Sequence, residues 1–353
     1  MATNTGTLDL KSLLSVRFQS PVQYGLDTLL KVIGDDLAAH NLIMLDQVGE
    51  LCEVSTDRQR RYGTSSDSDM QKVDEYGRGT AQKVKGGSTV GFPLDLFTYP
   101  LSWTQKWMET HTVADMAEQV QAAEKAHRRR VVKEIKLALY NSVNVDFEDY
   151  LVDFVSLGVK RLANADGAGI PDGPNGEKFD GATHTHYLAI NGITPTAVTN
   201  AVNTITEHGH TGNVRLAIAK ADETAVRNLA GFVPFTDERL IAGVSADHAA
   251  DAVSRANVGH RAIGIFGDAV VWVKPWALAG YPLAYDAGAT EKPLVFRQRD
   301  NESLQGLRIA AELADYPLFA RVMEAEFGIG AWGRTSAAVL YTGGAAYVVP
   351  TIA

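Results

Sequence analysis

The chain has 353 residues, of which 45% are hydrophobic and 21% charged, a composition typical of a globular protein with one large core or two smaller ones. A formal net charge of −9 argues against a dedicated nucleic-acid-binding protein, because that affinity depends on cations that neutralise phosphates. Cys52 is the only cysteine, so an intrachain disulfide and a cysteine-rich metal site are excluded, and a reducing cytosol suits the chain. The first ten residues do not resemble a signal peptide, and no apolar run is long enough to span a membrane, so we expect a soluble protein that is not secreted by the usual route.

The chain begins with a polar stretch over residues 1–20, which we interpret as a loose arm. Pro21 then opens a region in which apolar side chains repeat at helical spacing, and this pattern predicts a short helix. The repeating residues are Leu26, Leu29, Leu30, Ile33 and Leu37.

Residues 55–91 form a polar segment that cannot build a core of its own. The segment is rich in Arg, Lys, Asp, Ser and Gly, and its larger apolar residues are scattered singly. Those residues are Tyr62, Met70, Val73, Tyr76, Val84 and Val90. Because so little apolar surface cannot offset the entropy lost on ordering the segment, we expect another subunit to order it.

A long helix is predicted after this segment. Residues 92–97 first resume the apolar pattern, and Pro100 is expected to close it. Thr112 then precedes residues 113–141, which contain no Gly or Pro and repeat apolar residues at spacings of three and four. Such a helix is about 40 Å long and can serve as a spine. Its basic run, residues 128–130, cannot form one patch, because consecutive helical residues point about 100° apart.

The middle of the chain has a mixed α/β pattern. Residues 166–181 are dense in Gly and Pro and predict a surface loop or a crossing between subdomains. Thr194 and Pro195 predict the start of a helix that Gly209 ends. A strand over residues 214–218 and a short helix from Asp222 and Glu223 are expected to follow. Residues 262–266 and 269–273 flank Gly267 and Asp268, a two-residue turn that predicts a β-hairpin.

The C-terminal part is predicted to return to a sheet. Residues 294–297 have strand character, and residues 317–327 predict a helix. The pattern over residues 304–313 does not distinguish a helix from a strand. Residues 336–341 are expected to pair with residues 345–349 across the turn at 342–344, so that the last residues join a sheet.

Two motif-like patterns bear on function. Residues 328–333 match G-x-G-x-x-G, but they follow a predicted helix and lead into a strand, which is the reverse of the dinucleotide-binding context. We interpret these glycines as allowing close backbone approach, with Trp332 packed at a contact.

Four histidines offer a possible metal site. His184 and His186 share one face of a predicted strand, and His208 and His210 follow a helix. Asp180 and Glu207 are near them in sequence. No H-E-x-x-H is present and no ligand set has a recognised spacing, so exposed loop histidines are the favoured interpretation.

No catalytic motif is apparent. A G-x-S-x-G elbow and a P-loop are both missing from the sequence, and Cys52 has no visible histidine partner. We therefore predict a protein that is not an enzyme, with no cofactor and no metal.

The order of these parts resembles the major capsid proteins of tailed bacteriophages, which have the Hong Kong 97 fold, over nearly the whole chain. Residues 259–273 look like the axial-domain hairpin of that family, and residues 327–334 look like its final peripheral-domain elements. The resemblance implies an α+β fold with five parts: an N-terminal arm (1–50), an extended β-hairpin loop (51–101), a peripheral domain with a spine helix (102–149), an axial domain (150–290) and a return to the peripheral domain (291–353).

The resemblance also implies a function in assembly. Family members form hexamers and pentamers that build an icosahedral head around double-stranded DNA, and the expected location is the virion after assembly in the host cytoplasm. Expected partners are other copies of the chain, a separate scaffolding protein, a portal and a decoration protein, without a membrane. The acidic net charge fits a container that does not grip its DNA.

Candidate contacts between subunits lie mostly in the polar segment and near the C-terminus. They are Arg58, Arg60, Arg61, Lys83, Lys85, Trp332 and Arg334. The three arginines of the segment stand among acidic neighbours, so acids of another subunit are as good a partner for them as phosphate. Some family members crosslink the shell through a lysine, but neither Lys72 nor Lys83 nor Lys85 matches that position.

Two alternatives stay open at this point. An encapsulin-like bacterial compartment has the same fold and differs in carrying an enzyme cargo in place of DNA. A metal-dependent hydrolase built on the four histidines is distinguished by bound zinc or manganese.

Overall fold

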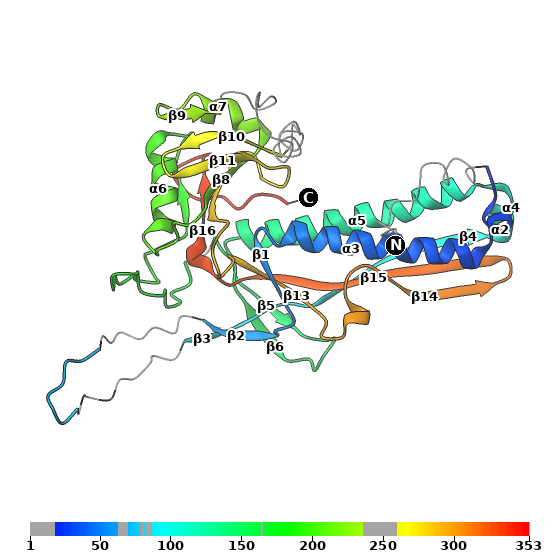
Figure 1. Cartoon of the computed structure of the whole chain (residues 1–353), viewed down its shortest axis with the longest axis horizontal. Coiled ribbons are helices and arrows are strands. Elements are labelled where there is room, and N and C mark those ends of the chain that lie inside the picture. The colour runs from blue at the N-terminus through cyan, green and yellow to red at the C-terminus, as the bar shows by residue number, and fades with distance from the viewer. Residues whose placement is uncertain are drawn as a thin grey trace.

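The computed structural model describes residues 18–62, 70–77, 79, 81, 87–163, 165–235 and 260–352. Residues 1–17 of the loose arm predicted over residues 1–20 lie outside the described residues, as do Lys83 and Lys85. The described part is a mixed α+β structure with two main sheets and two small hairpins (Figure 1). None of the helices in the described ranges is long and apolar enough to cross a membrane.

Two long helices run side by side over a five-stranded sheet (Figure 1). The helices of this part are α2 (Pro21–Tyr24), α3 (Leu26–Val48), α4 (Gln105–Thr110) and α5 (Val113–Tyr140). The prediction of a short helix after Pro21 was wrong, because α3 has 23 residues and contributes to the core. The apolar spacing in the sequence is interrupted after Leu37, because the next residue on the buried face of α3 is His40. His40 contacts His127 of α5 there.

The predicted spine helix is confirmed as α5. Thr112 and Asp115 form a capping box, in which the Asp115 backbone N–H donates to Thr112 Oγ1 at 3.3 Å and the Thr112 N–H donates to Asp115 Oδ2 at 2.8 Å. The helix buries an apolar face that includes Val131 and Ile135, and it ends at Tyr140.

The five-stranded sheet is built around one long strand. Its strands are β1 (Cys52–Ser55), β4 (Asp95–Thr104), β13 (Leu294–Gln298), β14 (Arg308–Asp315) and β15 (Leu318–Ala331). The order is β1-β13-β15-β14, and β4 also pairs with β15 over ten residue pairs, from Leu318↔Thr104 to Phe327↔Asp95.

The sheet corrects two predictions for this region and resolves a third stretch in which the sequence favours neither helix nor strand. Residues 317–327 were predicted as a helix, but they belong to β15; Ala, Met and Glu favour helix intrinsically, and pairing with strands on both sides overrides that preference. The open stretch 304–313 contains the start of β14. Pro100 does not close an apolar segment, because it lies inside β4, which is an edge strand where a missing N–H is tolerated.

The second sheet has seven strands in the order β7-β16-β12-β8-β11-β10-β9, with α6 packed on it. Its strands are β7 (Tyr187–Ala189), β8 (Val214–Ile218), β9 (Phe232–Pro234), β10 (Arg261–Phe266), β11 (Ala269–Val273), β12 (Leu283–Asp286) and β16 (Ala337–Tyr341), and its helices are α6 (Pro195–Thr206) and α7 (Glu223–Arg227). The predicted helices at 195 and 223, the strand at 214–218 and the β10–β11 hairpin are confirmed. Gly267 has a φ of 55° in the hairpin turn, a value that glycine adopts without strain.

The predicted pairing of residues 336–341 with 345–349 was wrong. Strand β16 pairs with β12 and β7 instead, and residues 345–349 form no strand. Tyr347 explains the apolar character of this segment, since its ring packs against Tyr187 and its hydroxyl donates to the Tyr140 carbonyl at 2.7 Å.

Two small hairpins lie below the junction of the two main sheets (Figure 1). They are β2 (Gln59–Tyr62) with β3 (Ser88–Gly91), and β5 (Val145–Glu148) with β6 (Ser156–Val159). A Cβ added to Gly91 would lie 2.4 Å from Leu157 Cβ, so glycine permits the close contact between the two hairpins.

Candidate intersubunit interface

Strands β2 and β3 begin the extended loop, which leaves the body of the molecule. This loop, and not the N-terminal segment, is called the arm from here on. The two strands pair from Gln59↔Gly91 to Tyr62↔Ser88, and residues 70–77 lie far beyond them, at the lower left of Figure 1. The apolar side chains in this distal part are open to solvent, with exposed fractions of 102% for Met70 and 77% for Tyr76. The described part of the arm thus lacks a core beyond its base, as the composition predicted.

The base of the arm is packed against the body by aromatic side chains. Tyr62 and Phe92 are buried with Val90, and the Trp332 ring meets both at an edge, with centroids 5.9 Å from Tyr62 and 6.3 Å from Phe92. Trp332 is therefore half-buried against its own chain. The glycines of the G-x-G-x-x-G string serve this packing, because a Cβ on Gly330 would lie 3.1 Å from the Phe92 ring.

Arg58 and Arg60 form ion pairs within the chain. Arg58 donates from both Nη atoms to Asp153 at 2.6 Å, in the bidentate geometry typical of strong charge-assisted pairs. The hydrogen bond from Arg58 lowers the pKa of Asp153. Arg60 donates to both oxygens of Glu53 at 2.7 and 2.8 Å, and its guanidinium lies 5.4 Å from the centre of the Trp332 ring.

Arg334 is buried beside the same base. Its Nη1 donates to Asp166 Oδ1 at 2.9 Å, and Lys160 pairs with the same carboxylate. Burial opposes ionisation of Asp166, but hydrogen bonds from Lys160 and Asn144 and the charge of Arg334 outweigh it and hold the pKa of Asp166 well below its usual value. These contacts fix the start of the Gly- and Pro-rich segment over residues 166–181, called the glycine-rich loop below.

The five predicted contact residues within the described ranges therefore gather at one place, the base of the arm. Arg58, Arg60 and Arg334 pair with acids of their own chain, whereas Arg61 is exposed beside a pocket of about 260 Å³ that Trp332 also lines. Their contact with a neighbouring subunit stays a prediction.

A second exposed apolar surface, which the sequence reading missed, lies on and around the β5–β6 hairpin. Its exposed side chains are Val143, Val145, Tyr150, Val152, Phe154 and Val155. Phe154 is 72% exposed and has a φ of 59°, which is strained for a residue with a side chain. Alternating Val and aromatic residues over 143–155 were the available signal.

A third exposed apolar surface is the tip of the β14–β15 hairpin. Leu313, Tyr316 and Leu318 are 56%, 84% and 50% exposed there. This tip lies at the opposite end of the molecule from the arm (Figure 1). The sequence does not indicate this tip, because residues 317–327 have the composition of a helix. Apolar surfaces of this kind are typical of sites that another protein covers.

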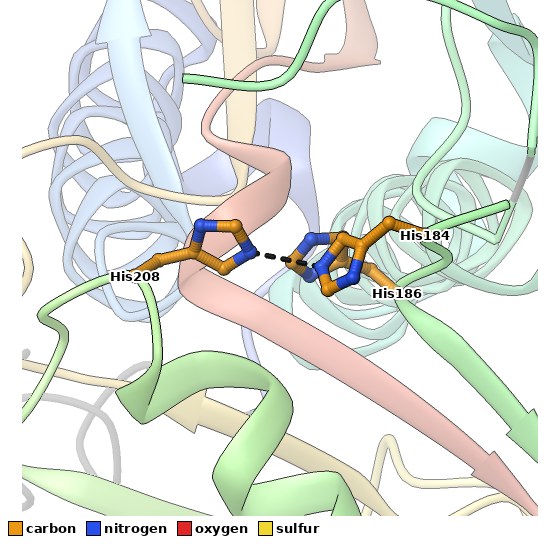
Figure 2. Close-up of side chains that lie close together, drawn as sticks. All are labelled: His184, His186 and His208. Carbon is orange, nitrogen blue, oxygen red and sulfur yellow. Dashed lines mark hydrogen bonds between the residues drawn. The ribbon is translucent and has the colours of Figure 1, made fainter. Parts of the chain in front are cut away.

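The structure also collects three of the four predicted histidines. His184, His186 and His208 turn toward one another, whereas His210 Nε2 lies 3.0 Å from Thr335 Oγ1 (Figure 2). The interpretation as exposed loop histidines was wrong, because His186 is buried and His184, His208 and His210 are partly buried. Neither His184 nor His186 lies within β7.

Comparison with solved structures finds close likenesses in fold. The chain is similar to a chain of Mycobacterium phage Patience, with a TM-score of 0.67 and 20% identity over 95% of this chain and 93% of that chain. More remote likenesses are the capsid of an empty GTA particle (TM-score 0.49, 13% identity, 86% and 90% covered) and the holo-SrpI encapsulin complex from Synechococcus elongatus (0.44, 10%, 89% and 91%). No protein-family model and no curated protein matched the chain. At this identity the first likeness establishes the fold, and the predicted resemblance to phage capsid proteins is confirmed at that level.

Proposed function

We propose that this chain is a major capsid subunit that assembles into hexamers and pentamers and forms an icosahedral phage head around double-stranded DNA. The observation that carries the proposal is the arm, whose apolar side chains lie exposed far from the body of a capsid-like fold. Within the described ranges no part of the chain covers Met70 or Tyr76, whereas a neighbouring subunit beneath the arm would bury both.

In this proposal the parts of the chain have distinct positions in the shell. The five-stranded sheet with α3 and α5 is the peripheral domain, and the seven-stranded sheet is the axial domain that meets its copies at the centre of each capsomer. The β2–β3 arm lies across the next subunit. The β14–β15 tip, at the far end of the peripheral domain, contacts a third subunit.

The size of such contacts accounts for assembly. Obligate interfaces bury about 2,000 Å² or more in total, so we expect an assembled subunit to use several apolar surfaces together. The exposed residues of the β5–β6 hairpin lie at the base of the arm, next to the Arg58 and Asp153 pair, so they are placed to continue an interface that the arm begins.

The net charge of −9 favours enclosure of DNA without tight binding to it. A scaffolding protein, a portal and a decoration protein are the proposed partners, and the proposed location is the virion capsid after assembly in the host cytoplasm. No observation favours an encapsulin-like compartment over this role.

The test is to express the chain alone and together with a neighbouring scaffold gene, and to examine the product by light scattering and negative-stain electron microscopy. Closed particles tens of nanometres across, or hexameric rings and sheets, are expected. A monodisperse monomer or small oligomer in both preparations contradicts the proposal. Nuclease-protected double-stranded DNA in particles from infected cells separates a phage head from a compartment filled with enzyme.

A further inference from the structure

The three histidines form a compact constellation whose chemistry matches a metal ion. One ring nitrogen of each lies within 4.8 Å of the others, and the Nε2 atoms of His184 and His208 are 3.0 Å apart. A tetrahedral zinc ion with Zn–N bonds of about 2.0–2.1 Å requires its ligand nitrogens to be about 3.3 Å apart. Small movements of two imidazole rings therefore suffice to complete the geometry.

His186 supplies the strongest single observation. Its side chain is 4% exposed, and its Nδ1 lies 3.2 Å from the carbonyl oxygen of Ala337, to which it donates when it carries the ring hydrogen. Its Nε2 is buried and makes no hydrogen bond to any group that the structure describes. A buried polar atom without a partner is costly, and a backbone carbonyl on the opposite ring nitrogen is the usual way in which a metal-binding histidine is oriented.

Burial of His186 and an aromatic ring partly shield the three imidazoles from solvent. Burial, together with the neighbouring His184 and His210, lowers the pKa of His208 to about 4. Burial and the two other histidines lower the pKa of His186 well below its usual value. The Phe179 ring covers the group, with its centroid 4.7 Å from that of His184 and 4.1 Å from that of His208. Imidazole nitrogens gathered in a partly apolar shell are a donor set typical of transition-metal sites.

We propose that His184, His186 and His208 bind one divalent transition-metal ion, with zinc as the best match to three imidazole ligands. A water molecule takes the fourth position, and Glu207 Oε1, 3.5 Å from His184 Nε2, adds negative charge beside the ion. The two Nε2 atoms are 3.0 Å apart, so without metal one of them donates its ring hydrogen to the other; in the bound form both Nε2 lone pairs face the ion and each ring hydrogen is on Nδ1.

The ion joins segments that are far apart in sequence. Figure 2 shows His208 reaching in from the end of α6, and His184 and His186 from the segment that leads into β7. The glycine-rich loop already lies against this end of the helix, because a Cβ on Gly209 would be 3.3 Å from the Pro174 ring. Metal binding thus fixes the loop and β7 to α6, a structural role in the seven-stranded domain that is separate from assembly itself.

The test uses the full chain without a histidine tag, stripped with a chelator, desalted and then exposed to Zn²⁺. One zinc per chain is expected by plasma mass spectrometry, with a rise of several degrees in the melting temperature that a chelator reverses. Substitution with Co²⁺ is expected to give the visible absorption of a tetrahedral site. Retention of less than about a tenth of one zinc per chain, or no rise in melting temperature, overturns the proposal.

Matched variants assign the ligands. His208→Gln and His184→Gln, which alter the less buried ligands, are expected to lose at least tenfold in zinc affinity while circular dichroism shows that they remain folded. His111→Gln is the control, because His111 is exposed on another part of the chain and stacks on Trp107. Equal zinc binding by His184→Gln, His208→Gln and the control places the metal elsewhere and refutes the assignment. None of these readouts requires particles, so the metal proposal and the capsid proposal fail independently.

Discussion

At the scale of single residues, the contact between α3 and α5 depends on a histidine that is buried without charge. His127 lies with its Nδ1 3.0 Å from His40 Nε2 and its ring 5.6 Å from that of Phe327. Burial, with the positive Arg128 and the neighbouring His40, lowers the pKa of His127 to about 4. In the unfolded chain the same side chain titrates near pH 6.5, at about its reference pKa.

This difference predicts acid sensitivity. Between about pH 6.5 and pH 4 the unfolded state binds the proton and the folded state does not, so the free energy of unfolding falls as the pH falls, by up to about 1.4 kcal/mol per pH unit for each such histidine. We expect His127→Gln to show a shallower loss of stability than the wild type in urea titrations at pH 7, 6 and 5.

Glu124 acts in the opposite direction but cancels in that comparison. Burial and the nearby Asp36 raise its pKa to about 7, so its protonation favours the folded state as the pH falls through this window. Both proteins contain Glu124, and the difference in slope therefore belongs to His127. Parallel stability curves for wild type and His127→Gln contradict the buried neutral histidine.

A second prediction at this scale concerns the buried face of α5. Val131→Asp places a carboxylate in a site that is 1% exposed, and an unpaired buried charge costs several kcal/mol. We expect the variant to be recovered as insoluble or unfolded protein, whereas Gln121→Asp, on the exposed face of the same helix, folds normally. Circular dichroism and thermal melting measure both. A normal melting curve for Val131→Asp disproves the assignment of this face to the core.

At the scale of elements, the base and the distal part of the arm have different roles. Tyr62 and Phe92 belong to a buried cluster at the base, whereas Met70 and Tyr76 lie exposed. We predict that replacing residues 63–87 by Asn-Gly, a two-residue turn between the paired Tyr62 and Ser88, leaves the melting temperature within a few degrees of wild type and abolishes closed particles. Electron microscopy and calorimetry give the two readouts. Particle formation by this variant means that the arm is dispensable, and an unfolded variant means that it belongs to the core.

Glu50, in the connection between α3 and β1, links this part of the chain to the seven-stranded sheet. Glu50 receives hydrogen bonds from Lys274 Nζ at 2.7 Å and from the Tyr285 hydroxyl at 2.6 Å, and it pairs with Arg215 at 3.1 Å. Burial opposes ionisation of Glu50, but these partners, Lys274 first, outweigh it and lower its pKa.

Glu50→Ala leaves the buried ammonium of Lys274 without its main counter-charge, and we expect a loss of about 3–5 kcal/mol in the free energy of unfolding. Lys274→Met in the same chain is expected to recover part of it, because the uncompensated charge is then removed. Urea unfolding of both variants, with the exposed Glu118→Ala as control, measures this. A loss for Glu50→Ala no larger than that of the control contradicts the role of Glu50 as a link between the sheets.

The elements that local pattern predicts best are those in which local preference and tertiary packing agree. In α5, Thr112, the capping acid and the uninterrupted apolar spacing all favour a helix, and the boundaries were predicted to within a residue. In β15, alternation of Met323, Ala325 and Phe327 indicates a strand, yet the other residues, Glu and Ala among them, favour a helix. Their helix preference produced the wrong prediction for residues 317–327. The sequence names four histidines as possible ligands, but their spacing could not show that three of them meet, because His208 reaches the other two only when α6 packs on its sheet.

At the scale of the whole molecule, charge is largely compensated within the chain. Arg58, Arg60 and Arg334 all pair with acids of their own subunit. With a net charge of −9, we expect the purified chain to bind duplex DNA no tighter than about 10⁻⁶ M at physiological salt, the upper range of non-specific binding. Fluorescence anisotropy at several salt concentrations measures this. A nanomolar affinity for duplex DNA that falls steeply with salt contradicts the proposal that the chain encloses DNA without binding it tightly.

Strand β15 also has a mechanical consequence for a shell. Its 14 residues extend about 46 Å, and along this length it joins the β14–β15 tip at one end to the strand next to the base of the arm at the other. With α5 packed along it, the strand forms a stiff beam between two contact surfaces. In the proposed shell, a tilt imposed by the neighbouring subunit at one end of the strand would be transmitted to the neighbour at the other end, and local curvature would pass from subunit to subunit around the particle.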